Sequence, residues 1–203
     1  LAWLAKHEKH LAGILVTHHH DDHTGGIASL QAEYDNKLSV YGPDNSPYPG
    51  ITHPLADGAE IFLAELGSHF KIIDTPGHTL DHICYYTEGV LLCGDTLFAG
   101  GCGRLFEGSA EQMFTSLSRL KQLPADTQVY CTHEYTESNF RFAVHAAPDN
   151  DVIHQRYRDV CAMRQRGEIT LPSSIAEELN SNVFLQVENA EEFAKLREAK
   201  DDF

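Results

Sequence analysis

The stretch "VTHHHDDHTGG", residues 16–26, carries four histidines and two aspartates between an apolar run and a pair of glycines. In an extended loop, side chains two residues apart point the same way, so His18 and His20 can hold one metal ion together. On a helix these two residues would not share a face. Asp22 and His23 then reach a second point in space. The stretch therefore predicts a metal site in a loop at the end of a strand.

The donor atoms of this motif restrict the metals that it suits. Imidazole and carboxylate without thiolate suit zinc, iron(II) or manganese, and they leave coordination positions open for water. The alternative is a solvated loop that happens to be rich in histidine. The position of the motif, between a strand of the buried type and a helix that starts with glycine, favours the metal site.

Three further segments repeat the pattern of an apolar strand followed by a polar residue. They are "KIIDTPGHT" with His78, "VLLCGDTLF" with Asp95 and "QVYCTHEYT" with His133. Taken singly, each is ambiguous, because a lone histidine after a strand is often structural. Functional side chains collect on the loops at strand ends of an α/β protein, so we expect these three to join the first motif.

Hydrophobic periodicity predicts an α/β fold followed by a helical part. Strands are expected at residues 12–17, 38–42, 60–64, 69–74, 82–86, 90–93 and 127–131, and helices at 1–10, 24–34, 109–123, 137–146, 151–166, 174–180 and 190–200. Ser109 and Gln112 form a capping box for one of these helices. The shift to helices alone predicts two domains, residues 1–147 and residues 148–203.

Charge and cysteine content narrow the class of protein. The 203 residues carry a formal net charge of −15, which disfavours binding to nucleic acid or to an anionic membrane. No apolar stretch is long enough to span a bilayer. The five cysteines form no CxxC pair, which is typical of reduced thiols. We expect a cytoplasmic monomer that acts on a small molecule, with neither nucleic acid nor membrane as partner.

Several segments together resemble glyoxalase II, the hydroxyacylglutathione hydrolase family of the metallo-β-lactamase superfamily. They are "THHHDDH", "TPGHT", "GDTLFAGGCGRLFEG", "HEYT", "LPSSIAEELNSNVFL" and "LREAKDDF", and they span nearly the whole chain. The resemblance implies a layered α/β fold, an αββα sandwich that lacks its N-terminal strands here. It also implies a small C-terminal helical domain that binds substrate.

The same resemblance implies a binuclear metal centre. One metal would take His18, His20 and His78, the second Asp22, His23 and His133, and Asp95 would bridge both ions together with a water or hydroxide. Asp22 and Asp95 would then be catalytic. The ions would be divalent, zinc above all, with iron or manganese as other choices. The reaction implied is hydrolysis of S-lactoylglutathione, a thioester, to glutathione and D-lactate, the second step of methylglyoxal detoxification.

The resemblance also implies contacts to glutathione, from Arg104, Tyr135, Arg197 and Lys200. From the residues alone, Arg197 and Lys200 are charges at the end of a helix, where they favour the helix dipole. Phe106 stands where some family members carry tyrosine, and Asp81 stands where a glycine is expected.

Two residues close to the motifs are predicted to have no direct part in the chemistry. His82 is interpreted as a core residue or as a support for a ligand, and Cys102 as a small buried residue rather than a nucleophile.

Three alternatives to the thioester hydrolase stay open on sequence alone. A related persulfide dioxygenase uses one iron and would not need Asp22, His23 and His133. A nuclease of the same superfamily is disfavoured by the acidic charge. A chain without catalytic activity would bind no metal.

Overall fold

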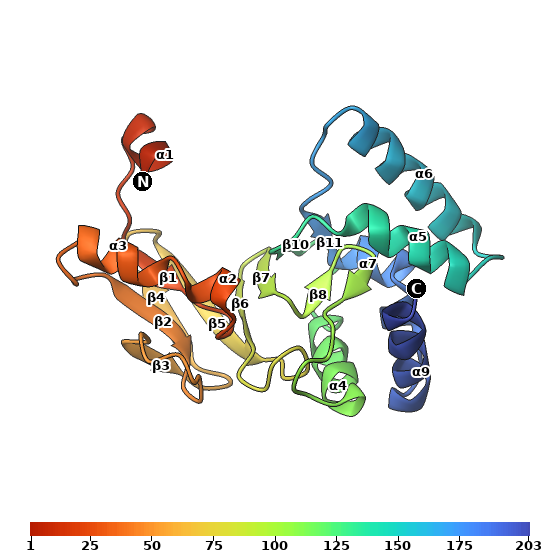
Figure 1. Cartoon of the computed structure of the whole chain (residues 1–203), viewed down its shortest axis with the longest axis horizontal. Coiled ribbons are helices and arrows are strands. Elements are labelled where there is room, and N and C mark those ends of the chain that lie inside the picture. Colours follow the sequence, from red (N-terminus) through yellow and green to blue (C-terminus); the bar gives the residue numbers. More distant parts are fainter.

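The computed structural model describes residues 1–203 and contains two β-sheets flanked by helices (Figure 1). The strands are β1 (Gly13–Leu15), β2 (Ser39–Pro43), β3 (His53–Leu55), β4 (Glu60–Leu63), β5 (Ser68–Asp74), β6 (Ile83–Thr87), β7 (Val90–Gly94), β8 (Leu97–Phe98), β9 (Gly101–Cys102), β10 (Gln128–Cys131) and β11 (Ser173–Ser174). The helices are α1 (Ala2–Lys6), α2 (Asp21–Thr24), α3 (Ile27–Glu33), α4 (Ala110–Leu120), α5 (Thr136–Ala146), α6 (Asp151–Gln165), α7 (Ile175–Ser181), α8 (Val183–Gln186) and α9 (Ala190–Asp201).

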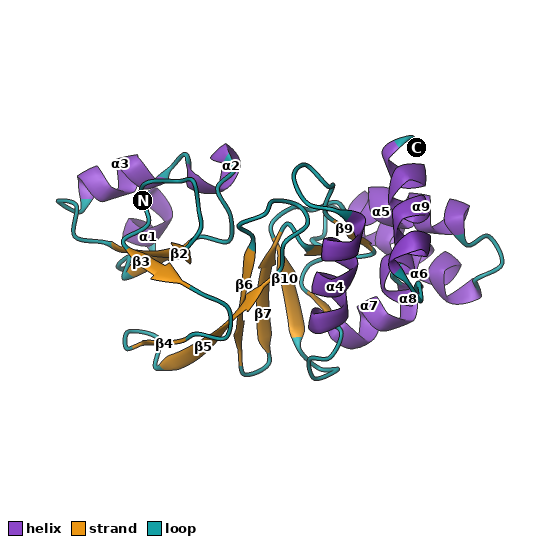
Figure 2. Ribbon diagram, turned by 90° about the horizontal axis from the view of Figure 1, so that it is seen from below, coloured by secondary structure: helices purple, strands orange, loops and turns teal.

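The two sheets differ in size and in strand direction. The smaller sheet has the order β1-β2-β3 and is parallel throughout. The larger sheet has the order β11-β10-β7-β6-β5-β4, in which only the β10–β7 pair is parallel. Strands β8 and β9 form a separate hairpin. Figure 2 shows the helices α2 and α3 beside the smaller sheet, and α4 with the C-terminal helices on the opposite side of the molecule.

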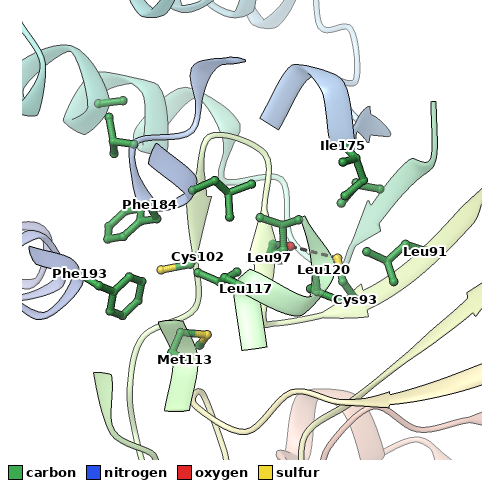
Figure 3. Close-up of a cluster of buried hydrophobic side chains, with 14 of the residues drawn as sticks. Leu91, Cys93, Leu97, Cys102, Met113, Leu117, Leu120, Ile175, Phe184 and Phe193 are labelled. Atoms are coloured by element: carbon green, nitrogen blue, oxygen red, sulfur yellow. Dashed lines mark hydrogen bonds between the residues drawn. The ribbon is translucent and has the colours of Figure 1, made fainter. Parts of the chain in front are cut away.

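Three apolar clusters separate four layers. Val16, Ile27 and Val40 pack between α3 and the smaller sheet. A second cluster, Leu55, Phe70, Ile72, Ile83 and Tyr85, lies between the two sheets. The largest, of 20 buried residues, fills the space between the larger sheet and the helices α4 to α9 (Figure 3). The order helix, sheet, sheet, helix is the αββα sandwich that the resemblance implies.

Alternation along the strands explains why the larger sheet is buried on both faces. Ile72 belongs to the cluster between the sheets, whereas its neighbour Ile73 belongs to the cluster against the helices. Tyr85 and Cys84 divide in the same way on the next strand. Successive side chains of a strand point to opposite faces, so a strand between two apolar layers needs apolar residues at successive positions, as at residues 72–73 of β5 and 83–85 of β6.

Strand direction brings the polar motifs together. β5, β7 and β10 run the same way, since β5 and β7 are both antiparallel to β6 and β10 is parallel to β7. Their C-terminal ends therefore meet at one edge of the sheet. The end of β1 joins them there, because the Ile83 amide donates to the Thr17 carbonyl at 2.8 Å. All four loops that carry the predicted ligands leave from this edge.

Most of the predicted elements are present, but the short elements α2, β11 and α8 were not predicted, and others differ. The capping box of α4 is confirmed, with both the Ser109 and the Gln112 side chains bonded. β3 lies inside a segment that its proline and glycine content predicted to be loop, and the β8–β9 hairpin was not predicted. The first helix covers only Ala2–Lys6. None of the helices combines the length and the apolar character that crossing a bilayer requires.

Candidate metal centre

The "THHHDDH" motif is part loop and part helix. His18 and His20 lie in the loop after β1, as predicted, whereas Asp22 and His23 lie on the single turn of α2. The Thr24 hydroxyl donates to the carbonyls of His19 and His20, at 3.1 and 3.0 Å, and so closes the loop onto this turn. The second half of the motif therefore reaches its own point in space because the helical turn redirects it.

One group of three imidazoles converges on a single point. His20 Nδ1 lies 3.1 Å from His18 Nε2 and 3.1 Å from His78 Nε2. His78 Nδ1 donates to the Arg104 carbonyl at 2.8 Å, which leaves its Nε2 as the nitrogen with a free lone pair. Metal-binding histidines are commonly oriented by such a bond from the other ring nitrogen.

A second group lies beside the first and shares Asp95 with it. Asp22 Oδ2 is 3.3 Å from His133 Nε2 and 3.6 Å from His23 Nε2. The Asp95 carboxylate lies between the groups, with Oδ1 3.4 Å from His23 Nε2 and Oδ2 3.4 Å from His133 Nε2 and 3.6 Å from His78 Nε2. The structure thus brings all seven predicted ligands to one place.

The electrostatics of this cluster favour bound cations. Burial, reinforced by the neighbouring imidazoles, lowers the pKa of His18 far below its ordinary range, and burial also lowers the pKa of His78. Burial would raise the pKa of Asp95, but the neighbouring imidazoles of His23, His133 and His78 hold that pKa below its ordinary value. His23 Nε2 and Asp95 Oδ1 are buried without a hydrogen-bond partner.

Neutral imidazoles, carboxylates and orphaned buried donor atoms are what metal ions require of a protein. The residues present fit the metals that the motif predicts, and the His/Asp cluster is compatible with a binuclear site.

His82 supports Asp95 and is not among the converging ligands. The Asp95 amide donates to His82 Nε2 at 3.0 Å. A backbone amide can only donate, so the His82 proton is on Nδ1, which faces the hydroxyls of Thr75 and Thr96 at 3.0 and 3.1 Å. Burial lowers the pKa of His82 to about 3. His82 is therefore a neutral residue that fixes the backbone of Asp95.

His19 points away from the ligands and contacts Asp81. Its Nδ1 lies 2.9 Å from Asp81 Oδ1. The buried Asp81 carboxylate also accepts from the hydroxyls of Thr79, at 2.7 Å, and Ser46, at 2.8 Å. Asp81, at the position where the resemblance implies glycine, thus joins three loops around the metal centre.

A cavity of about 400 Å³ opens onto the two groups. It is lined by His20, Asp22, His78, Asp95, Phe98, Arg104, Phe106, His133 and Tyr135. Tyr135 stacks on His133 with ring centroids 4.9 Å apart. Phe106 is exposed and sets its edge against His20 and His78, at 5.5 and 5.2 Å between centroids. Of the four predicted glutathione contacts, Arg104 and Tyr135 line this cavity.

The other two, Arg197 and Lys200, do not line the cavity. Arg197 is buried, donates to the Cys102 carbonyl at 3.1 Å and pairs with Asp201 at 2.9 Å. Lys200 donates to Asn139 Oδ1 at 2.6 Å, and burial lowers its pKa to about 8. Arg197 is thus bonded within the protein through Nη1 and Nη2, and its contact with glutathione stays a prediction.

Cys102 is buried beside Arg197, and burial raises the pKa of its thiol to about 11. A thiol held in this protonated form is a poor nucleophile.

Comparison with known proteins places the chain in a family. Residues 1–133 match the family described as the metallo-beta-lactamase superfamily, and residues 134–203 match the hydroxyacylglutathione hydrolase C-terminus. A hydroxyacylglutathione hydrolase of Pseudoalteromonas translucida is 55% identical over 186 residues, which cover 92% of this chain and 71% of that protein.

Solved structures agree with the fold. ETHE1 from Myxococcus xanthus superposes with a TM-score of 0.72 at 27% identity, covering 97% of this chain and 72% of that one. The protein TTHA1623, solved in a di-iron-bound form, superposes with a TM-score of 0.55 at 29% identity, covering 65% of this chain and 74% of that one.

Proposed function

This chain belongs to the hydroxyacylglutathione hydrolases of the metallo-beta-lactamase superfamily, and on that premise we propose how its site hydrolyses a thioester of glutathione. The protein is a thioester hydrolase. Its substrate is S-lactoylglutathione or a close 2-hydroxyacyl relative, and its products are glutathione and the 2-hydroxy acid. The observation that carries this proposal is the convergence of two ligand groups on one cavity, with Asp95 between them.

We propose that His18, His20 and His78 hold one divalent ion, that Asp22, His23 and His133 hold a second, and that Asp95 contacts both. Zinc is the proposed metal, because the donors are nitrogen and oxygen atoms of the kind that zinc sites use. Two such ions supply Lewis acidity toward a carbonyl and bring the pKa of water to about 7. Asp22 and Asp95 add two negative charges, which partly balance the charge of the ions.

The neighbouring residues keep the ligands in the state that the reaction needs. The Arg104 carbonyl fixes the tautomer of His78, and His82 fixes the Asp95 backbone. No separate nucleophile or general acid is required of the chain. A thiolate whose conjugate acid has a pKa of about 8.5 leaves without a proton donor at neutral pH.

Glutathione is proposed to lie along the rim of the cavity, against Arg104 and Tyr135. The Arg104 side chain is 60% exposed, so its guanidinium is available to a carboxylate, and its weak contact with Asp201, at 3.5 Å, is replaceable. The Tyr135 hydroxyl can bond a peptide group of the tripeptide. Lys200 is a further candidate. Its ammonium donates to Asn139, which in turn donates to the Ala99 carbonyl in the segment that leads to Arg104. The net charge of −15 makes these few cations the natural place for an anionic substrate.

The test is hydrolysis of S-lactoylglutathione, followed by the loss of thioester absorbance in the ultraviolet, on protein of measured metal content. We expect turnover that disappears when a chelator removes the metal and returns when zinc is restored. A chain that consumes oxygen with a glutathione persulfide, holds one iron and leaves the thioester intact would show that the dioxygenase alternative is correct.

A further inference from the structure

The β8–β9 hairpin, residues 97–102, lies between Asp95 and Arg104 in the chain and is close to three of the proposed ligands. Asp95 stands two residues before it. The Arg104 carbonyl that follows it accepts from His78 Nδ1 at 2.8 Å. The ring of Phe98, within it, lies 6.1 Å from the ring of His133. A shift of this hairpin therefore moves the surroundings of both ligand groups at once.

The hairpin makes few backbone hydrogen bonds of its own, because it is only two residues wide on each side. Its remaining peptide groups are bonded by side chains from the helices that follow it in sequence. The Gly100 amide donates to Glu178 Oε2 at 2.9 Å. Asn182 Nδ2 donates to the Gly101 carbonyl at 2.9 Å and to the Phe98 carbonyl at 3.3 Å.

Two further side chains complete this pattern. Asn139 Nδ2, on α5, donates to the Ala99 carbonyl at 3.0 Å. Arg197 Nη1, on α9, donates to the Cys102 carbonyl at 3.1 Å, while its guanidinium carbon lies 5.2 Å from the ring centre of Phe184. Figure 3 shows Cys102 between Phe184 and Leu97 in the apolar cluster that surrounds these bonds.

Two of the four side chains are also bonded to each other, and all four are buried. Asn182 Nδ2 also donates to Glu178 Oε2 at 2.9 Å, and the four residues are between 0% and 5% exposed. Burial raises the pKa of Glu178. Buried polar groups with this many partners specify one arrangement of the backbone, because any other arrangement leaves some of them unpaired.

We propose that Asn139, Glu178, Asn182 and Arg197 are positioning residues for the metal centre, which act by holding the β8–β9 hairpin. The C-terminal helices then do more than contact substrate. They set the position of the peptide segment that carries Asp95 at one end and the His78 acceptor at the other. The proposal rests on the proposed function for its kinetic consequence, but not for its structural one.

The glycines of the hairpin agree with this close fit. A Cβ at Gly101 would lie 2.6 to 2.8 Å from the side-chain amide of Asn139, and one at Gly100 would lie 2.6 Å from the ring of Phe140. Gly100 also has a φ of +69°. The hairpin can approach the helices only because it has no side chains at these two positions.

The experiment compares Asn182→Ala, between α7 and α8, with the control Asn180→Ala, an exposed asparagine of α7, in the whole chain. Hydrogen exchange is measured on the metal-free protein, zinc affinity by titration, and kcat and KM with S-lactoylglutathione. Asn182→Ala should speed exchange of the Gly100 and Gly103 amides and weaken zinc binding and kcat by about 10-fold, with KM changed by less than about two-fold. Asn180→Ala should behave as the wild type.

Two more variants keep the test decisive. Glu178→Gln retains an acceptor for the Gly100 amide and should restore most of what Glu178→Ala loses. Asn139→Ser frees a single hairpin carbonyl, that of Ala99, together with the Lys200 ammonium, so it should fold and show the same pattern at smaller amplitude if Asn182→Ala does not fold. Normal zinc affinity, kcat and hairpin exchange in the folded variants, or a change confined to KM, would overturn the proposal. Faster exchange and weaker zinc binding in a protein that never hydrolyses the thioester would keep the positioning role and reject the proposed function.

Discussion

The hydrogen bond from the Asp95 amide to His82 gives the sharpest prediction about the metal centre. His82→Leu keeps a side chain of similar size but removes the acceptor. Thr75 and Thr96 are bonded to each other at 3.0 Å, so their hydroxyls keep a partner. The Asp95 amide does not, because Asp95 is buried and its amide has no other acceptor.

The expected cost follows from that single orphaned group. A buried amide without a partner destabilises the folded state by about 1–3 kcal/mol. For a chain of this size each kcal/mol lowers Tm by about 2–4 °C, so we expect a fall of about 3–10 °C in the metal-free protein. The Asp95 carboxylate should also lose its orientation, with a drop of roughly 10- to 100-fold in zinc affinity and kcat.

His82→Gln is the matched control, since the glutamine carbonyl oxygen can take the place of Nε2. Thermal unfolding of the metal-free proteins and zinc titration measure both effects. The glutamine variant should recover most of the stability and zinc affinity that the leucine variant loses. If the two variants are equal in Tm and in zinc affinity, the bond to Asp95 is unimportant and the reasoning fails.

Three more predictions concern the same site. Burial lowers the pKa values of His18, His78 and His82, so below a pH of about 6.5 the unfolded metal-free chain binds up to three more protons than the folded one. The free energy of unfolding, measured with urea, should therefore be complete above that pH and fall by up to about 4 kcal/mol per pH unit as the pH is lowered. A free energy of unfolding that does not change between pH 7 and 5 would contradict this. His20→Ala should lose metal and activity. His19→Ala, which loses its contacts with Asp81 and Glu107, should keep its metal and lose about 1 kcal/mol of stability; equal metal loss in both variants would refute the assignment. Arg104→Ala should raise KM for S-lactoylglutathione roughly 5- to 10-fold, the equivalent of about 1 kcal/mol, and leave kcat and metal content unchanged. A fall in kcat with an unchanged KM would contradict the proposal that Arg104 binds glutathione.

The sequence predicts most of the longer strands and the residues of the His/Asp cluster because both depend on local patterns. The apolar runs at residues 69–74 and 82–86 are long enough to identify strands β5 and β6. The alternation of His18 and His20 predicts a metal-binding loop, and short polar motifs mark His78, Asp95 and His133, which the structure brings into the same cluster. These loops converge because β5, β7 and β10 run in the same direction, so that their C-terminal ends lie at one edge of the sheet.

Other features of the fold and of the site depend on contacts between residues that are distant in the sequence, so no local sequence pattern predicts them. β3 is a strand because it pairs with β2, although its segment is rich in proline and glycine. The β8–β9 hairpin has two residues in each strand and is held mainly by side chains from α5, α7, α9 and the residue before α8. From the sequence alone, Arg197 and Lys200 are interpreted as charges at the end of a helix. In the structure, α9 packs so that Arg197 is buried against Cys102. Burial of that kind is a property of the packed structure.

The central claim is that the chain holds two metal ions in the two ligand groups and uses them to hydrolyse a glutathione thioester. Titration of the metal-free protein with zinc, with hydrolysis of S-lactoylglutathione measured at each point, tests it most directly. We predict saturation at two zinc ions per chain, and saturation at one ion for His133→Ala with activity lost. Saturation of the wild-type chain at a single ion, or full zinc occupancy without thioester hydrolysis, would contradict the claim.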